Sequence, residues 1–170
     1  MPARHRPGFD GRVTRFLLLP SLLAAAAMPA VAAPQALGAF GSWGAFREGG
    51  RCYAIAQPAQ ASRDTQAFAS IGVWPGRGSQ LNIRFSREKR EGSAVLLRVD
   101  GRTFQLLGGG RDAWAPDPRA DAEIQAAMRT GVDMIVETRA AGGALLRDQY
   151  ALRGAATAMD AAAIACAPRR

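Results

Sequence analysis

The sequence predicts a mainly β or α+β domain, an antiparallel β-sandwich or partly open barrel of about seven or eight strands with one internal helix and a C-terminal helix. Short segments of alternating polar and apolar residues run from residue 43 to residue 107 and resume at residue 132, with glycine-containing turns between them. Helical patterns occur at residues 117–131 and 155–166. Many short strands with few helices are typical of an antiparallel fold.

The first 32 residues have the pattern of an export signal. Four arginines precede an apolar run at residues 16–27, and the small residues around Ala30 and Ala32 suit a cleavage site. The run is shorter than the roughly 20 apolar residues that span a bilayer, and Pro20 interrupts it. We therefore expect an exported bacterial protein, periplasmic or secreted, with no transmembrane segment after cleavage.

This interpretation divides the chain into a signal peptide, a flexible lead-in, a single globular domain and a tail, at residues 1–32, 33–42, 43–166 and 167–170. The first 32 residues hold four of the 22 basic residues and one of the 14 acids, so the formal net charge falls from +8 to +5 on cleavage. The basic cluster at residues 84–90 is interrupted by Glu88. We expect it to be a solvated strand end and turn, and we expect no nucleic-acid partner.

The first two strands are expected at residues 43–46 and 51–56, joined by a glycine turn. In the second, Cys52, Ala54 and Ala56 alternate with Tyr53 and Ile55, so the two sets should lie on opposite faces. A proline, Pro58, ends this strand, and a polar loop should follow at residues 59–66.

Four further strands are expected, at residues 68–74, 80–86, 94–99 and 102–107. The second of these has the clearest half-buried pattern, with Leu81, Ile83 and Phe85 on one face. Asp100 and Gly101 form the signature of a two-residue hairpin. The three glycines at residues 108–110 are expected to be a flexible loop, since the lysine and hydroxyl residue of a phosphate-binding loop are missing.

The internal helix should begin after Asp117, which can cap its N-terminus, with Pro118 in the first turn and Gly131 at the end. Its apolar stripe consists of Ile124, Ala127 and Met128. A second hairpin is expected at residues 132–138 and 144–152. A closing helix follows, with Met159, Ala163 and Cys166 on one stripe.

Cys52 and Cys166, the two cysteines of the chain, are expected to form a structural disulfide. Two free thiols or a redox couple are the alternative, although a redox pair would normally have the close spacing Cys-x-x-Cys. Closing a loop of about 100 residues stabilises a fold by roughly 4–5 kcal/mol in the chain-entropy model.

Histidine is absent from the expected mature chain, because His5 lies in the signal. Ser-His-Asp and Cys-His sites are therefore excluded, and a metal site would need carboxylates alone. We assign no catalytic, cofactor-binding or metal-ligating residue, and we expect neither a cofactor nor an enzyme. Asp112, Asp117 and Asp121 are the closest acids; two of them suit a helix start, and a calcium site is the alternative.

Trp74 and Trp114 are candidate ligand-contact aromatics. Trp74 precedes Pro75, and Trp114 lies two residues before Pro116, each at the end of a segment. An aromatic ring at such a place can contact a ligand, and packing within the domain is the alternative.

Several short motifs resemble the invasion-associated locus B family of exported bacterial proteins. The matching segments are Trp43-Gly44-Ala45-Phe46, Arg51-Cys52-Tyr53-Ala54, Pro58, Val99-Asp100-Gly101-Arg102-Thr103-Phe104-Gln105-Leu106, Ala113-Trp114, the helix at 121–131, and the ending from Leu152-Arg153-Gly154 to Cys166. The resemblance covers nearly all of the mature chain. It implies an exported, non-enzymatic envelope-associated or binding protein with an unidentified envelope or protein partner, and it supplies no catalytic residue. The best-known members are linked to entry of a host-associated bacterium into red blood cells.

Two other functions remain open. A histidine-free hydrolase could act on cell-wall glycans through a pair of carboxylates, and two acids with raised pKa in one cleft would support it. A periplasmic chaperone or assembly factor would need an exposed apolar groove or an open sheet edge.

Overall fold

The computed structural model describes residues 33–60 and 66–168, so the expected signal peptide lies outside the described residues. The described part contains ten strands and two helices. In chain order these are β1 (Gln35–Phe40), β2 (Trp43–Glu48), β3 (Arg51–Ala56), β4 (Phe68–Trp74), β5 (Gly78–Arg84), β6 (Val95–Val99), β7 (Arg102–Gly109), β8 (Asp112–Trp114), α1 (Pro118–Thr130), β9 (Asp133–Arg139), β10 (Leu145–Ala151) and α2 (Ala155–Ala165).

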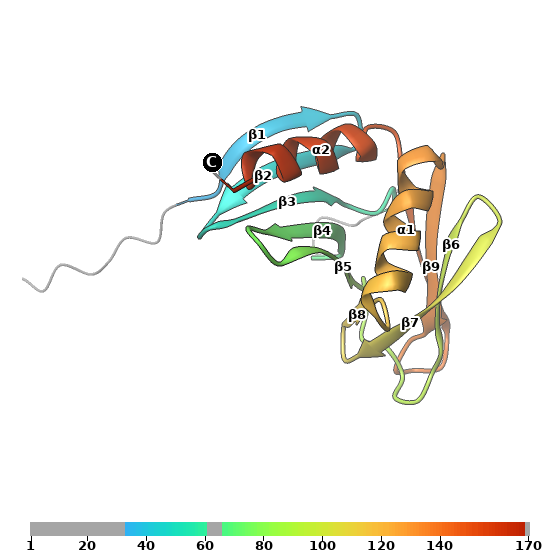
Figure 1. The fold of residues 1–170 in the computed structure, drawn as a ribbon. Helices are drawn as coiled ribbons and strands as arrows, with labels where there is room; N and C mark the ends of the chain where they lie inside the picture. The colour runs from blue at the N-terminus through green and yellow to red at the C-terminus, as the bar shows by residue number, and fades with distance from the viewer. Residues whose placement is uncertain (1–32, 61–65, 169–170) are drawn as a thin grey trace, which may run out of the picture. The chain divides into compact units, whose positions relative to one another are not determined.

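All ten strands belong to one antiparallel sheet in the order β1-β2-β3-β4-β5-β8-β7-β6-β9-β10. The sheet is not closed, since β1 and β10 are its two edges. Helix α2 packs on β1, β2 and β3, and α1 contacts β5 and α2 (Figure 1). The prediction of a mainly β or α+β antiparallel fold with two helices is confirmed.

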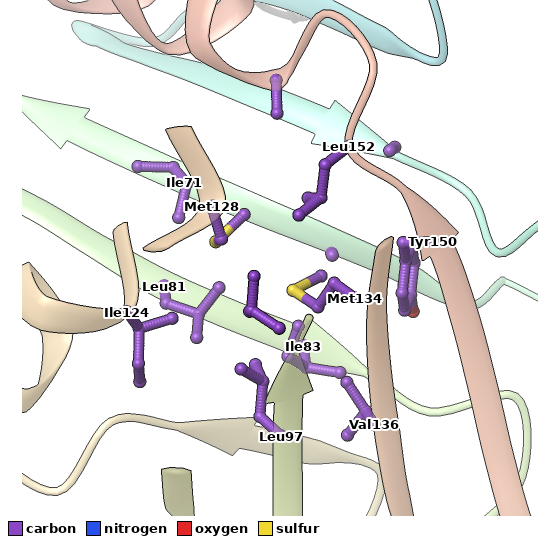
Figure 2. Packing of buried hydrophobic residues seen from close by; sticks show 14 of the residues in the cluster. Ile71, Leu81, Ile83, Leu97, Ile124, Met128, Met134, Val136, Tyr150 and Leu152 are labelled. Carbon is purple, nitrogen blue, oxygen red and sulfur yellow. The ribbon is translucent and has the colours of Figure 1, made fainter. Parts of the chain in front are cut away.

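The core is formed by the inward faces of the strands together with the buried sides of both helices, α1 and α2. Leu81 and Ile83 from β5 meet Leu97 from β6 and Met134 from β9, as Figure 2 shows. The predicted alternation is confirmed in β3, where Cys52, Ala54 and Ala56 are buried. The predicted helix is also confirmed: Asp117 accepts a hydrogen bond from the amide of Ala120 at 2.8 Å.

Strand β1 occupies a segment that was expected to be a flexible lead-in. It pairs with β2 through partners such as Ala36 with Phe46 and Phe40 with Trp43. Leu37 and Phe40 also pack against the core. Pairing with a neighbouring strand thus gives residues 35–40 an order that their small, irregular side chains do not predict, and the expectation was wrong there.

The glycine segment at residues 108–110 is another correction. Gly108 and Gly109 belong to β7 and pair with Ala113 and Asp112 of β8, so they do not form a flexible loop. A Cβ atom added to Gly108 would lie 2.8 Å from Cγ2 of Val95, which leaves no room for a side chain. Gly108 therefore permits close packing of the Val95 side chain from β6 against β7.

Two smaller expectations also differ from the structure. Lys89, within the basic cluster, is buried, and its Nζ donates to the carbonyl of Arg90 at 2.9 Å. On α2, Ala163 is exposed and Ala162 is buried next to Cys166. The reason is the period of 3.6 residues per turn, which places Ala162 on the same face as the buried Ala155, Ala158 and Met159, and Ala163 at the edge of that face.

The predicted disulfide is present. Cys52 on β3 is bonded to Cys166 at the end of α2, with the two Cα atoms 5.8 Å apart. Both cysteines are buried with Ala162, and Val73 packs against them. Across the described ranges, no helix has the length and apolar character needed to cross a membrane.

Candidate functional site

The two tryptophans singled out in the sequence line one cleft of about 540 Å³, which we call the tryptophan cleft. Trp74 comes from the end of β4 and Trp114 from the end of β8. Trp114 is 37% exposed, so it is not a core residue. The other residues of the lining are Arg77, Ser79, Gln80, Ala115, Pro116, Asp117, Pro118 and Asp121.

A fork between two strands creates this cleft. Strand β5 pairs along its whole length with β4, but with β8 only through Ile83 and Arg84. Beyond Ala113 the chain leaves the side of β5 and enters the Pro116 turn that leads into α1. The first half of β5 therefore has β4 on one side and the tryptophan cleft on the other.

Asp121 closes the fork on the side of α1. Its carboxylate accepts a hydrogen bond from the backbone amide of Leu81 at 3.0 Å, and the contact is buried. Burial raises the pKa of Asp121, while the hydrogen bonds from Leu81 and from the Gln125 side chain act in the opposite direction. A second bond, from Ser79 Oγ to Gln125 Oε1 at 2.9 Å, also ties α1 to β5.

The three acids considered as a calcium site have separate structural contacts. Asp112 forms a two-point pair with Arg84, with Nε–Oδ1 at 3.0 Å and Nη2–Oδ2 at 2.8 Å. Asp117 caps α1, and Asp121 binds the Leu81 amide. Within residues 33–60 and 66–168, no group of three histidine, cysteine, aspartate or glutamate side chains is placed to hold a metal ion.

A second cleft, of about 400 Å³, adjoins the first on the outward side of β3, β4 and β5. Trp74 and Gln80 line both clefts, so the two are neighbours across the indole ring. We call the outward aromatic side chains here, together with their neighbour on β2, the aromatic face. It consists of Phe46, Tyr53, Phe68 and Trp74.

Two rings of the aromatic face lie over glycines. A Cβ atom built on Gly72 would lie 2.6 Å from the Trp74 ring, and one built on Gly44 would lie 2.8 Å from the Phe46 ring. The rings therefore fold back along their own strands and cover the backbone. Phe46 stacks on Tyr53, with ring centroids 5.6 Å apart and an angle of 25° between the ring planes.

The arginines on this side of the sheet are paired with carboxylates. Arg51 lies 3.1 Å from Glu48, and Arg84 pairs with Asp112. Each guanidinium also lies over a ring, 5.3 Å from the Tyr53 centroid for Arg51 and 5.9 Å from the Phe68 centroid for Arg84. The aromatic face therefore carries little uncompensated charge.

The aromatic face was not predicted from the sequence. Its signal is in the alternation itself: the residues opposite the buried alanines of β3 and β4 include Tyr53, Ile55 and Phe68, where a solvent-facing strand would carry polar side chains.

No protein-family model matches the chain, and no curated protein matches it in sequence. Among solved structures, the chain is similar to invasion associated protein B from Bartonella henselae, with a TM-score of 0.55 and 19% sequence identity. The similarity covers 72% of this chain and 92% of the Bartonella chain. At this identity the likeness is one of fold.

Proposed function

We propose that this chain is an exported, non-enzymatic binding protein, periplasmic or secreted and associated with the bacterial envelope, that holds its ligand in the tryptophan cleft. The observation that carries the proposal is the meeting of Trp74 and Trp114, from two separate strands, in one cleft. Ligand pockets commonly combine aromatic walls with a few polar groups, and here Arg77, Ser79 and Gln80 supply the polar groups.

Export is supported by two independent features. The signal-like pattern of residues 1–32 is one. The other is the bond between Cys52 and Cys166, since disulfides form and persist in oxidising compartments. The fold likeness to invasion associated protein B agrees with the family resemblance of the motifs.

Binding is favoured over hydrolysis because the carboxylates of the tryptophan cleft have structural contacts. Asp117 is occupied by the first turn of α1, and Asp121 by the amide of Leu81. A carboxylate pair for glycoside hydrolysis needs one acid and one base facing the same bond. Neither Asp117 nor Asp121 is free for that work.

The test is a titration of the mature, oxidised protein with separated protein, lipid and glycan fractions of a bacterial envelope. Tryptophan fluorescence is the signal that reports binding. Trp43 is buried and serves as a constant background. Trp114→Ala should weaken the apparent affinity for the active fraction, followed through the remaining Trp74, at least tenfold, as expected for a central aromatic contact. Leu145→Ala is the matched control, because Leu145 is an exposed apolar residue of β10 outside both clefts. An unchanged apparent affinity of Trp114→Ala would contradict the proposal.

An assembly factor is a second candidate, and the edge of β5 favours it. The backbone amide of Leu81 donates to Asp121 and so points away from β4. Backbone amides two residues apart point to the same side of a strand, so the Ser79 amide also points away from β4, toward the tryptophan cleft. An extended peptide could add to this edge. Protection of the Ser79 amide from hydrogen exchange on adding an apolar peptide would support this function, and unchanged exchange would contradict it.

A further inference from the structure

We propose that the ligand is an uncharged glycan, and that its sugar rings stack on the aromatic face and continue past Trp74 into the tryptophan cleft. This inference rests on the proposed binding function and adds to it the class of ligand and a second surface. Four observations carry it: the packing of the rings on their own strands, their register across the strands, the polar groups beside them and the balance of charge.

The rings are held in place for stacking. Since Trp74 covers Gly72 and Phe46 covers Gly44, these rings are held against the backbone of their own strands, and both side chains are only partly buried. The face of an aromatic ring carries a partial negative charge. A pyranose ring presents a flat patch of C–H groups with partial positive charge, so ring and sugar can stack face to face.

The rings also form a row across the sheet. Phe46 on β2 is opposite Tyr53 on β3, and Tyr53 is opposite Gly72 on β4, the residue that Trp74 covers. Adjacent strands are about 4.8 Å apart, so the row offers one ring for each strand spacing. Such a row fits a ligand with several ring units better than it fits a single small molecule.

Polar side chains lie next to the row. Gly72 is opposite Gln80, and Ser70 is opposite Asn82, all on the outward side of β4 and β5. Amide and hydroxyl side chains both donate and accept hydrogen bonds, as sugar hydroxyls do. This mixture is poorly suited to a lipid chain, which would leave the polar groups without partners.

The charge balance indicates an uncharged ligand. Arg51 and Arg84 are paired with Glu48 and Asp112, and the lining of the tryptophan cleft contains both Arg77 and acidic residues. Recognition of nucleic acid or of a sulfated glycan depends on cations that are free to replace counterions. Paired arginines can instead form hydrogen bonds to hydroxyls without excess charge.

The sharing of Trp74 and Gln80 by the two clefts gives the ligand a continuous path from β3 to β8. A glycan long enough to occupy both clefts should therefore bind more tightly than a short one. We expect hexasaccharides to bind at least tenfold more tightly than the corresponding disaccharides.

The experiment titrates the mature oxidised protein by calorimetry with neutral hexasaccharides of glucose and of N-acetylglucosamine, and with an anionic heparin hexasaccharide. We expect binding of a neutral hexasaccharide that hardly changes between 50 and 500 mM salt. The glycan proposal would be overturned if neither of the two neutral hexasaccharides bound. It would also be overturned if only the heparin hexasaccharide bound.

Gly72→Ala is the most specific variant, since it keeps the Trp74 indole but forces the ring away from its position over the backbone of residue 72. Gly72→Ala should weaken binding of the neutral hexasaccharide at least tenfold. Trp74→Ala should have the same effect, and it serves as the test if Gly72→Ala does not fold. Gly142→Ala is the matched control, because a Cβ atom there meets nothing within 4 Å. Full affinity in both Gly72→Ala and Trp74→Ala would overturn the proposal.

The experiments distinguish a failure of the glycan inference from a failure of the binding function. If an envelope fraction gives a response that depends on Trp114 while no neutral hexasaccharide binds, the binding function stands and the glycan inference is overturned. If neither the fractions nor the hexasaccharides bind, both are overturned.

Discussion

The backbone amide of Ser42 donates to the carbonyl of Arg153 at 3.0 Å, which joins the turn after β1 to the turn before α2. The two turns touch through glycines. A Cβ atom on Gly154 would collide with the carbonyl of Phe40, and one on Gly41 would collide with that of Arg153. Near its two ends the described domain is therefore held by backbone contact that leaves no space for a side chain.

Gly154→Ala should destabilise the protein by at least about 3 kcal/mol, the sum of left-handed strain and overpacking. Gly154 has φ of +92°, and its contact is with backbone that cannot rotate away. Urea unfolding measures the loss. Gly143→Ala is the control, with φ of +85° but nothing within 4 Å, and it should lose only about 1–2 kcal/mol. Equal losses in the two variants would show that the Phe40 contact contributes nothing.

Asp121 should make stability depend on pH. Burial raises its pKa in the folded protein above the value of about 3.9 in an unfolded chain, so the folded state holds the proton to higher pH. The favourable contribution is complete below pH of about 4 and is lost as the pH rises through the folded pKa. Asp121→Asn should remove this fall while keeping an oxygen for the Leu81 amide, and urea unfolding between pH 3.5 and 7 tests it. Parallel stability curves would contradict it.

Asp121→Ala separates the hydrogen bond from the charge. It leaves the buried Leu81 amide without its acceptor, which should cost about 1–3 kcal/mol at every pH. Because the amide lies beside the tryptophan cleft, hydrogen exchange at Leu81 should also increase. A variant as stable as Asp121→Asn at neutral pH would contradict this role.

Tyr150→Phe should leave stability unchanged or increase it by about 1–2 kcal/mol. The Tyr150 hydroxyl is buried and finds no hydrogen-bond partner among residues 33–60 and 66–168, and burial, with Asp148 nearby, raises its pKa. Removing the hydroxyl takes away a desolvated polar group and keeps the ring. Calorimetric melting measures the change, and a loss above about 1 kcal/mol would mean that the hydroxyl has a partner.

Replacing both cysteines with alanine should lower stability by up to about 4–5 kcal/mol, because the unfolded chain gains the freedom of an open loop. Hydrogen exchange should rise first in α2, whose last turn is held to β3 by the bond. The reduced wild-type protein is the control and should match the double variant. Protection of α2 that is unchanged in both would show that its buried face alone keeps the helix in place.

Local patterns in the sequence were sufficient for most elements. In β5, Leu81 and Ile83 alternate with polar residues, and in α1 the Asp117 cap and Gly131 mark both ends. Strands β1 and β8 carry no such pattern. Asp112–Trp114 is ordered by pairing with β5 on one side and β7 on the other, a non-local effect that three residues cannot encode alone.

The candidate site was predictable only in part. Trp74 and Trp114 were singled out by their neighbouring prolines, and the structure places them on one cleft; contact with a ligand stays a prediction. Their meeting depends on the fork between β5 and β8, which is a property of sheet order. The packing of the Trp74 ring over Gly72 depends on the orientation of the Trp74 side chain, which the alternation of polar and apolar residues does not specify.

The disulfide bond between Cys52 and Cys166 also determines whether the protein stays in one piece after a protease cuts its backbone. Every described element from β4 to α2 lies between the two cysteines. A protease that nicks one turn in that interval produces two pieces that remain in one covalent molecule, so no fragment is shed and the cut becomes visible only after reduction. A nicked copy would thus keep both sides of the tryptophan cleft together.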